Sequence, residues 1–271
     1  MEEVIQVDAT PVYALDQVER AAVDVQVTTA KAYPRNIQKS RRTAIELVTM
    51  DEPTARSCSY ALPRGGKPIT GPSVHLARIL AQTYGNMRAE AKVVEITDKQ
   101  VISRGTAWDL ENNYAVAFEV RRSIWGNRGR YTDDMITVTG NAANAIAYRN
   151  AVLAIIPKGI LDAAYNAAGE LITGDLSDAT KLTQSRKKAL DLFLAEYNIT
   201  EPECLKMLGK ETVNQIGVEQ LKVLFATHQA LKDGDTTVTE LLKDIRAKET
   251  IEDKKEKLKG NKGKTTQPTL L

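Results

Sequence analysis

The segment that decides the fold is residues 87–125, MRAEAKVVEITDKQVISRGTAWDLENNYAVAFEVRRSIW. It contains three runs of alternating apolar and polar side chains, separated by two short turns: Met87–Thr97, Gln100–Leu110 and Tyr114–Trp125, with Asp98-Lys99 and Glu111-Asn112-Asn113 between them. Alternation with a period of two and short turns between the runs are typical of adjacent antiparallel strands. The sequence therefore predicts a three-stranded antiparallel meander with one buried face.

The segments on either side of the meander complete the fold. Ser59–Leu62 and Lys67–Thr70 flank the turn Arg64-Gly65-Gly66 and predict a β-hairpin. A helix is expected from Ser73 to Tyr84, and a brief strand over Met135–Val138. The alanine-rich stretch Asn141–Ile156 predicts a helix that crosses the sheet closely. The predicted fold class is α+β, with a hairpin, a helix, a three-stranded antiparallel meander, a crossing helix and a small C-terminal helical module.

Composition shifts along the chain predict its domains. Residues 1–30 form an N-terminal arm, either loosely ordered or with a short helix near Val18–Val27. Residues 31–168 form the core, and 169–179 are interpreted as a linker. Residues 181–246 predict a helical, partner-binding module, and the lysine-rich residues 247–271 a disordered basic tail. The start of the chain has no basic and apolar leader pattern, and a cytoplasmic location is expected.

The near-neutral net charge of +2 hides a strong asymmetry. Residues 31–158 contain 19 basic and 11 acidic residues, whereas residues 1–30 contain one basic and six acidic residues. A basic centre beside an acidic flank indicates an anionic partner. Surplus lysines on an ordinary soluble domain are the alternative.

Signatures of catalysis and of metal or nucleotide binding are weak. The segment Gly65-Gly66-Lys67 lacks the first glycine and the hydroxyl residue of a phosphate-binding loop. His75 and His228 are isolated, and the two cysteines are far apart in the sequence. We therefore expect no enzymatic activity, no cofactor and no metal. One alternative is a metal-dependent nuclease in which Glu90 and Lys92, on one strand, form half of the site.

The remaining candidates are basic and aromatic residues that could bind nucleic acid. Arginine suits phosphate because its planar group donates two hydrogen bonds, and aromatic rings can stack on bases. Trp125 and Tyr131 lie among these arginines in the sequence, although Trp125 could also belong to the core. The predicted DNA-binding residues are Arg64, Lys67, Arg121, Arg122, Arg128, Arg130, Tyr131, Arg149, Asn150 and Lys158.

The order of these elements resembles the phage single-strand annealing proteins of the RecT/Redβ family and the related annealing domain of the Rad fifty-two type. The resemblance covers about residues 35–165. It rests on Tyr60-Ala61-Leu62-Pro63 before the glycines, Ile69-Thr70-Gly71 leading into Val74-His75-Leu76-Ala77 and Tyr84-Gly85-Asn86, Gly129-Arg130-Tyr131 before Asp133-Asp134, and Arg149-Asn150-Ala151-Val152. Asn150 departs from the family, because a second basic residue is expected there.

The resemblance implies an ATP-independent protein that binds single-stranded DNA and anneals complementary strands in phage-type recombination. Such proteins form rings or filaments, and their partners are single-stranded DNA, the annealed duplex and further copies of the chain. A host single-strand binding protein or a phage exonuclease would bind residues 181–246, and the location implied is the cytoplasm of a bacterial host. A recombination or replication adaptor protein is a further alternative.

Overall fold

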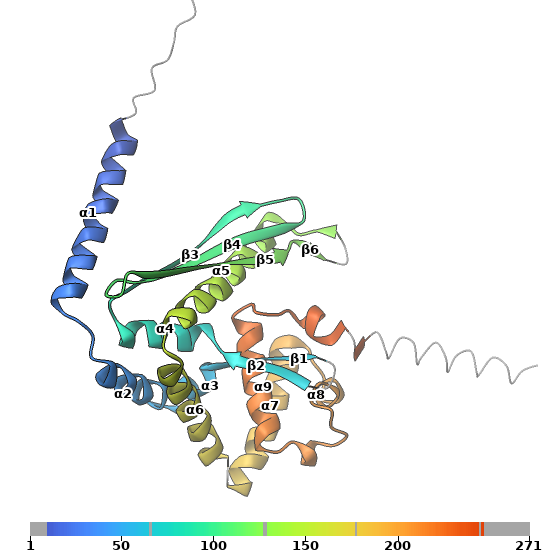
Figure 1. Cartoon of the computed structure of the whole chain (residues 1–271). Coiled ribbons are helices and arrows are strands. Elements are labelled where there is room, and N and C mark those ends of the chain that lie inside the picture. The colour runs from blue at the N-terminus through green and yellow to red at the C-terminus, as the bar shows by residue number, and fades with distance from the viewer. Residues whose placement is uncertain (1–9, 65–66, 127–128, 177, 244, 247–271) are drawn as a thin grey trace, which may run out of the picture. The chain divides into compact units, whose positions relative to one another are not determined.

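The computed structural model describes residues 10–64, 67–126, 129–176, 178–243 and 245–246. They fall into two compact units. We call the described residues of Met1–Leu47 and Ala77–Ala164 the sheet unit, and those of Val48–Leu76 and Tyr165–Leu271 the hairpin unit. The predicted α+β class is confirmed, with a two-stranded hairpin, a three-stranded antiparallel meander on a long helix and a helical C-terminal region (Figure 1).

The secondary structure divides between the units as follows. The sheet unit contains α1 (Thr10–Ala32), α2 (Ile37–Val48), β3 (Met87–Ile96), β4 (Gln100–Asp109), β5 (Tyr114–Ser123), β6 (Trp125–Gly126), β7 (Gly129–Arg130) and α5 (Asp133–Ile155). The hairpin unit contains α3 (Glu52–Ser57), β1 (Ser59–Arg64), β2 (Lys67–Pro72), α7 (Ala179–Tyr197), α8 (Glu201–Leu208), η1 (Val213–Gln215) and α9 (Val218–Lys232). Two helices, α4 (Val74–Tyr84) and α6 (Lys158–Asp175), are divided between the units, and the last residue of α2, Val48, also belongs to the hairpin unit. No described helix combines the length and the apolar character that a membrane crossing requires.

The meander has β4 at its centre, paired with β3 on one side and β5 on the other. Helix α5 lies along one face of this sheet and contacts all three strands (Figure 1). The approach is close at Gly105, where an added Cβ would lie 2.2 Å from the carbonyl oxygen of Ala147. Ala143, Ala147 and Ala151 of α5 are fully buried. These small side chains let the helix backbone approach the sheet, as the alanine-rich sequence predicts.

The beginning of α5 corrects one prediction. Met135–Val138 is helical, so the brief strand expected there is wrong. The helix begins earlier because the Thr132 side chain caps it by accepting a hydrogen bond from the Met135 amide. Asp133 and Asp134 follow in the first turn, where carboxylates stabilise the positive end of a helix. Ile136 then packs in the core with Val101, Ile124 and Ala143.

The alternation predicted for the third strand is only partly matched by burial. Val116 and Val120 are partly buried, whereas Tyr114 is 55% exposed and Phe118 is 40% exposed on the same side of β5. Helix α5 contacts β4 more extensively than β5, which is an edge strand. On this edge strand, Tyr114 and Phe118 therefore remain in contact with solvent.

The hairpin unit confirms the β-hairpin, in which β1 and β2 pair from Ser59 with Pro72 to Arg64 with Lys67. Helix α9 packs against β1. The linker predicted over residues 169–179 is wrong for most of its length, because α6 continues to Asp175. Residues 238–243 form a further helical segment, and the predicted basic tail at 247–271 lies outside the described residues.

The predicted N-terminal arm is helical where the structure describes it. Helix α1 extends from Thr10 to Ala32, which is longer than the short helix expected near Val18–Val27. Residues 1–9 lie outside the described part of the chain.

Candidate nucleic-acid interface

The end of β5 carries two adjacent arginines that leave the strand on opposite sides of the sheet. Arg122 pairs with Val101, a core residue on the face that α5 covers, and Arg121 pairs with Ile102. Successive side chains of a strand point to opposite faces. Arg121 is exposed and Arg122 is partly buried. The two guanidinium groups therefore lie on opposite faces of the sheet. A single ligand could contact both of them only at the end of the sheet, where it can reach both faces.

The chain after β5 forms a small arm at that end of the sheet. Ile124 is fully buried, and its amide donates a hydrogen bond to the carbonyl oxygen of Lys99 at 3.0 Å. Strands β6 and β7 then pair antiparallel, with Trp125 opposite Arg130. We call Lys99, Arg121, Arg122, Trp125 and Arg130 the β6–β7 corner.

Four cations of the β6–β7 corner occupy neighbouring backbone positions, in the β3–β4 turn, at the end of β5 and in β7. Lys99, Arg121 and Arg130 are exposed, and Arg122 is partly buried. The nearest acidic residue along the chain is Asp98, which is also exposed, in the same turn as Lys99. A cluster of this kind can neutralise several phosphates of a nucleic-acid strand.

Tyr131 lies next to the corner but contributes to the core. It is partly buried and packs against the cluster formed by Val101, Ile124, Ile136 and Ala143. A Cβ added at Gly126 would lie 2.7 Å from the Cε1 atom of Tyr131, so the ring lies close over the backbone of β6. Packing on both sides leaves this ring less accessible to a base than its position in the sequence suggests.

The predicted residues on and after α5 differ in exposure. Arg149 is only 8% exposed and Asn150 is partly buried. Lys158 is exposed, and its Nζ lies 2.7 Å from the Asp162 carboxylate one helical turn later. The burial of Arg149 disfavours a direct contact with phosphate, whereas Lys158 remains accessible.

Three predicted residues cannot be placed with the others. Arg128 lies outside the described residues. Arg64 and Lys67 pair through their backbones at the tip of the β-hairpin, in the hairpin unit, and their side chains lie outside the described part. The structure therefore brings together Arg121, Arg122, Arg130 and Tyr131 of the predicted set.

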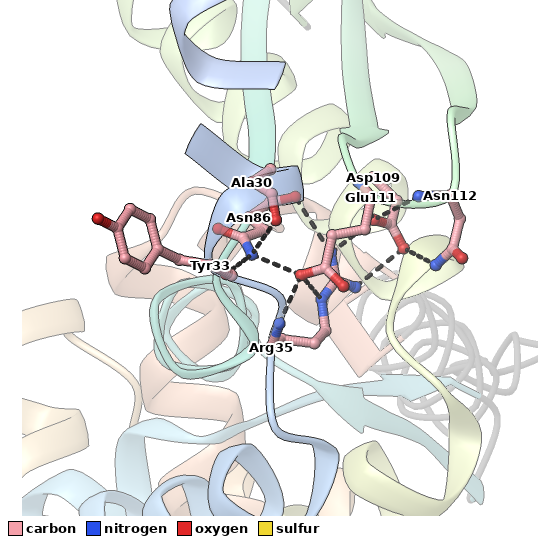
Figure 2. Close-up of polar contacts among 7 residues, drawn as sticks. All are labelled: Ala30, Tyr33, Arg35, Asn86, Asp109, Glu111 and Asn112. Carbon is pink, nitrogen blue, oxygen red and sulfur yellow. Dashed lines mark hydrogen bonds and ion pairs between the residues drawn. The ribbon is translucent and has the colours of Figure 1, made fainter. Parts of the chain in front are cut away.

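Sequence reasoning missed a polar network around Arg35 in the sheet unit (Figure 2). The Arg35 guanidinium forms a two-pronged contact with Asp109, with nitrogen–oxygen distances of 2.9 and 2.5 Å. Its Nε donates to Glu111 at 3.0 Å. The side chains of Arg35 and Asp109 are each only 5% exposed, and that of Glu111 is 18% exposed. The network is therefore a largely buried ion cluster.

Asn86 and Tyr84 complete the surroundings of Arg35. The Asn86 carbonyl accepts a hydrogen bond from Nη2 of Arg35 at 3.1 Å, and its side-chain amide donates to the carbonyl of Tyr33 at 2.8 Å. The Arg35 guanidinium lies 3.8 Å from the centre of the Tyr84 ring. The Tyr33 ring points away from the cluster, and only its backbone takes part (Figure 2). These contacts join the α1–α2 connection to the start of β3 and the end of β4. Both of these strand ends lie at the end of the sheet opposite the β6–β7 corner.

The network also changes the ionisation of its two carboxylates. Burial by itself would raise the pKa of Asp109, but hydrogen bonds from Arg35 and Asn112 lower it below its ordinary value. Burial opposes ionisation of Glu111 too, and its pKa is lowered by hydrogen bonds from Asn86 and from the Arg35 backbone. Both groups are ionised at neutral pH and paired within the fold, which indicates an architectural role.

The described residues contain no group of three or more His, Cys, Asp or Glu side chains arranged to hold a metal ion. Burial raises the pKa of Cys58 to about 12, and burial with nearby glutamates does the same for Cys204. Both thiols are free and protonated at neutral pH. Glu90 and Lys92 of the alternative nuclease site are exposed on β3, and Glu90 lies 3.8 Å from Arg88.

The hairpin unit has a surface hollow of about 370 Å³ beside α9. Its lining includes Arg56, Tyr165, Lys222 and Phe225. The Arg56 guanidinium lies 3.6 Å from the centre of the Phe225 ring, and Arg56 also pairs with Glu52. The contact between Arg56 and Phe225 is a cation–π interaction in the wall of this hollow.

Comparison of the chain with protein-family models, with curated proteins and with solved structures found no match in any of the three.

Proposed function

We propose that this protein binds single-stranded DNA and anneals complementary strands without ATP, as an oligomeric ring or filament. The proposal combines the resemblance to the RecT/Redβ family with one structural observation, the gathering of four cations at the β6–β7 corner. The resemblance supplies the reaction, and the corner supplies a surface of the required charge.

The positive charge of the β6–β7 corner suits a nucleic-acid strand that is bound through its phosphates, independently of its base sequence. Phosphate contacts by Lys99, Arg121, Arg122 and Arg130 would hold a strand by its backbone. Base pairing with the second strand would then supply specificity. Annealing needs no nucleotide hydrolysis, because duplex formation is itself favourable.

Exposed apolar side chains on the edge strands support assembly. Val94 and Ile96 of β3 are 45% and 54% exposed, and Tyr114 and Phe118 of β5 are 55% and 40% exposed. Among the described strands, nothing pairs with the outer edges of β3 and β5. Exposed strand edges with apolar side chains favour association with another chain, and we propose further copies of this protein as that partner.

A role for residues 181–246 in binding another recombination protein is part of the proposal. The hollow beside Arg56 and Phe225 is partly lined by this region. A single-strand binding protein or an exonuclease are the partners that the resemblance implies.

The proposal is tested by measuring how the affinity for an unstructured oligonucleotide depends on salt. Each phosphate contact on a single strand contributes about −0.7 to the slope of log K against log salt concentration. Four contacts therefore predict a slope of about −3, and an affinity loss of roughly 50-fold between 50 and 200 mM salt. A slope near zero, or no binding, contradicts the proposal. Micrographs with and without DNA test assembly.

A further inference from the structure

Trp125 is the aromatic side chain of the β6–β7 corner. It is 51% exposed, although burying a tryptophan is among the most favourable contributions to a core. Its neighbour Ile124 is fully buried, so the arm itself is anchored while the indole is left in solvent. The prediction that Trp125 could belong to the core is therefore wrong.

The exposed indole is held in place by several contacts. Its Nε1 donates a hydrogen bond of 2.7 Å to the carbonyl oxygen of Asp98, in the turn between β3 and β4. The Trp125 amide bonds to the Ser123 hydroxyl at 3.1 Å, and the residue pairs with Arg130 across the arm. An aromatic ring positioned before binding loses little entropy when a ligand stacks on it.

The surroundings of Trp125 favour a nucleotide as its ligand. Arg130 lies opposite it in the strand pair, and the Lys99 carbonyl anchors the residue that precedes it. Proteins that bind single strands combine cations for the phosphates with aromatic rings for the bases. The π-face of any base can stack, so such a contact is tolerant of sequence, as annealing requires.

We propose that Trp125 stacks on an unpaired nucleobase of bound single-stranded DNA, with Arg130 and Lys99 contacting the flanking phosphates. This inference rests on the proposed function and assigns the stacking contact to Trp125 and not to Tyr131, whose ring packs in the core. Stacking contributes to affinity independently of the phosphate contacts, which makes the two separable.

The chain contains two tryptophans, so a Trp108→Phe variant leaves Trp125 as the sole indole emitter. In this background, oligothymidylate is expected to quench the fluorescence. An oligonucleotide of the same length with abasic positions offers the phosphates without the bases, and it is expected to quench much less.

Binding of variants to the same two probes separates stacking from charge. Trp125→Ala is expected to weaken oligothymidylate binding by about 5- to 150-fold, the loss of one stacked base, without changing the salt slope. It is expected to leave binding of the abasic probe unchanged. Arg130→Ala is expected to weaken binding of both probes and to flatten the slope by about 0.7.

A Trp125→Phe variant controls for damage to the arm, because it keeps a ring but cannot donate to Asp98. It is expected to bind oligothymidylate more tightly than Trp125→Ala does. The inference is overturned if the unaltered protein binds with the predicted salt slope while Trp125→Ala binds equally tightly, an outcome that leaves the proposed function standing. Equal losses for Trp125→Ala on both probes also overturn it. If the unaltered protein binds neither probe, both proposals fail.

Discussion

Replacing Arg35 with alanine is expected to destabilise the sheet unit by about 3–5 kcal/mol, the usual loss when one partner of a buried ion pair is removed. The mutation would leave Asp109, whose side chain is 5% exposed, and Glu111, whose side chain is 18% exposed, without their cation. It would also remove the contact between the guanidinium and the Tyr84 ring, at 3.8 Å.

Urea unfolding followed by tryptophan fluorescence measures this change directly. Trp108 and Trp125 are the two tryptophans of the chain, and both belong to the sheet unit. Their emission therefore reports the unit that contains Arg35. The unfolding midpoint of the variant is expected to fall well below that of the unaltered protein.

A matched control separates burial from charge. Arg42 pairs with Glu46 at 3.8 Å, but the two side chains are 72% and 63% exposed. Arg42→Ala is expected to change the free energy of unfolding by less than about 0.5 kcal/mol, because solvent screens exposed pairs. In an Asp109→Asn background, Arg35→Ala is expected to cost less by at least about 1 kcal/mol. A loss for Arg35→Ala no larger than for Arg42→Ala would refute the reasoning.

Three further outcomes are expected. Folding lowers the pKa values of Asp109 and Glu111, the carboxylate partners of Arg35, so their contribution to stability is complete above about pH 4.5 and is lost as the pH falls through the folded pKa values. The difference in unfolding free energy between the unaltered protein and Arg35→Ala, measured by urea unfolding, should therefore become smaller in acid. Gly105→Ala should destabilise the sheet unit by roughly 1–3 kcal/mol in the same assay, because the new Cβ would lie 2.2 Å from a carbonyl oxygen of α5, whereas Gly159→Ala, with nothing within 4 Å, should stay within about 0.5 kcal/mol. Cys58 and Cys204, with pKa values of about 12, should resist a thiol reagent at pH 8 until the chain unfolds, and rapid labelling of the folded protein would contradict their burial.

The regular part of the fold could be predicted from sequence because its signals are local. Alternation over Met87–Trp125 and the turn residues between the runs indicate the meander, and the alanines of α5 indicate close packing. The strand predicted at Met135–Val138 was wrong because four β-branched or apolar residues suit either structure. The cap at Thr132 and the packing of Ile136 in the core stabilise the helix instead of a strand.

The parts that sequence could not predict depend on contacts between distant segments. Arg35 and Asp109 are 74 residues apart, and no periodicity links them. Trp125 follows a strand, where a core position and an exposed one are equally compatible with the pattern. Its exposure is set by the turn of the chain at Ile124 and by the bond to Asp98. Arg149 shows the reverse case, a basic residue on an expected binding helix that the fold buries.

The central claim is that the cations of the β6–β7 corner bind single-stranded DNA and promote annealing without ATP. Its most direct test is the rate at which complementary oligonucleotides pair, measured without nucleotide, together with the salt dependence of binding. The unaltered protein and Arg42→Ala are expected to accelerate pairing alike. A variant with both Arg121→Ala and Arg130→Ala is expected to pair strands more slowly and to have a salt slope flatter by about 1.4. Pairing no faster than in buffer with the unaltered protein, or an unchanged slope in the double variant, would contradict the claim.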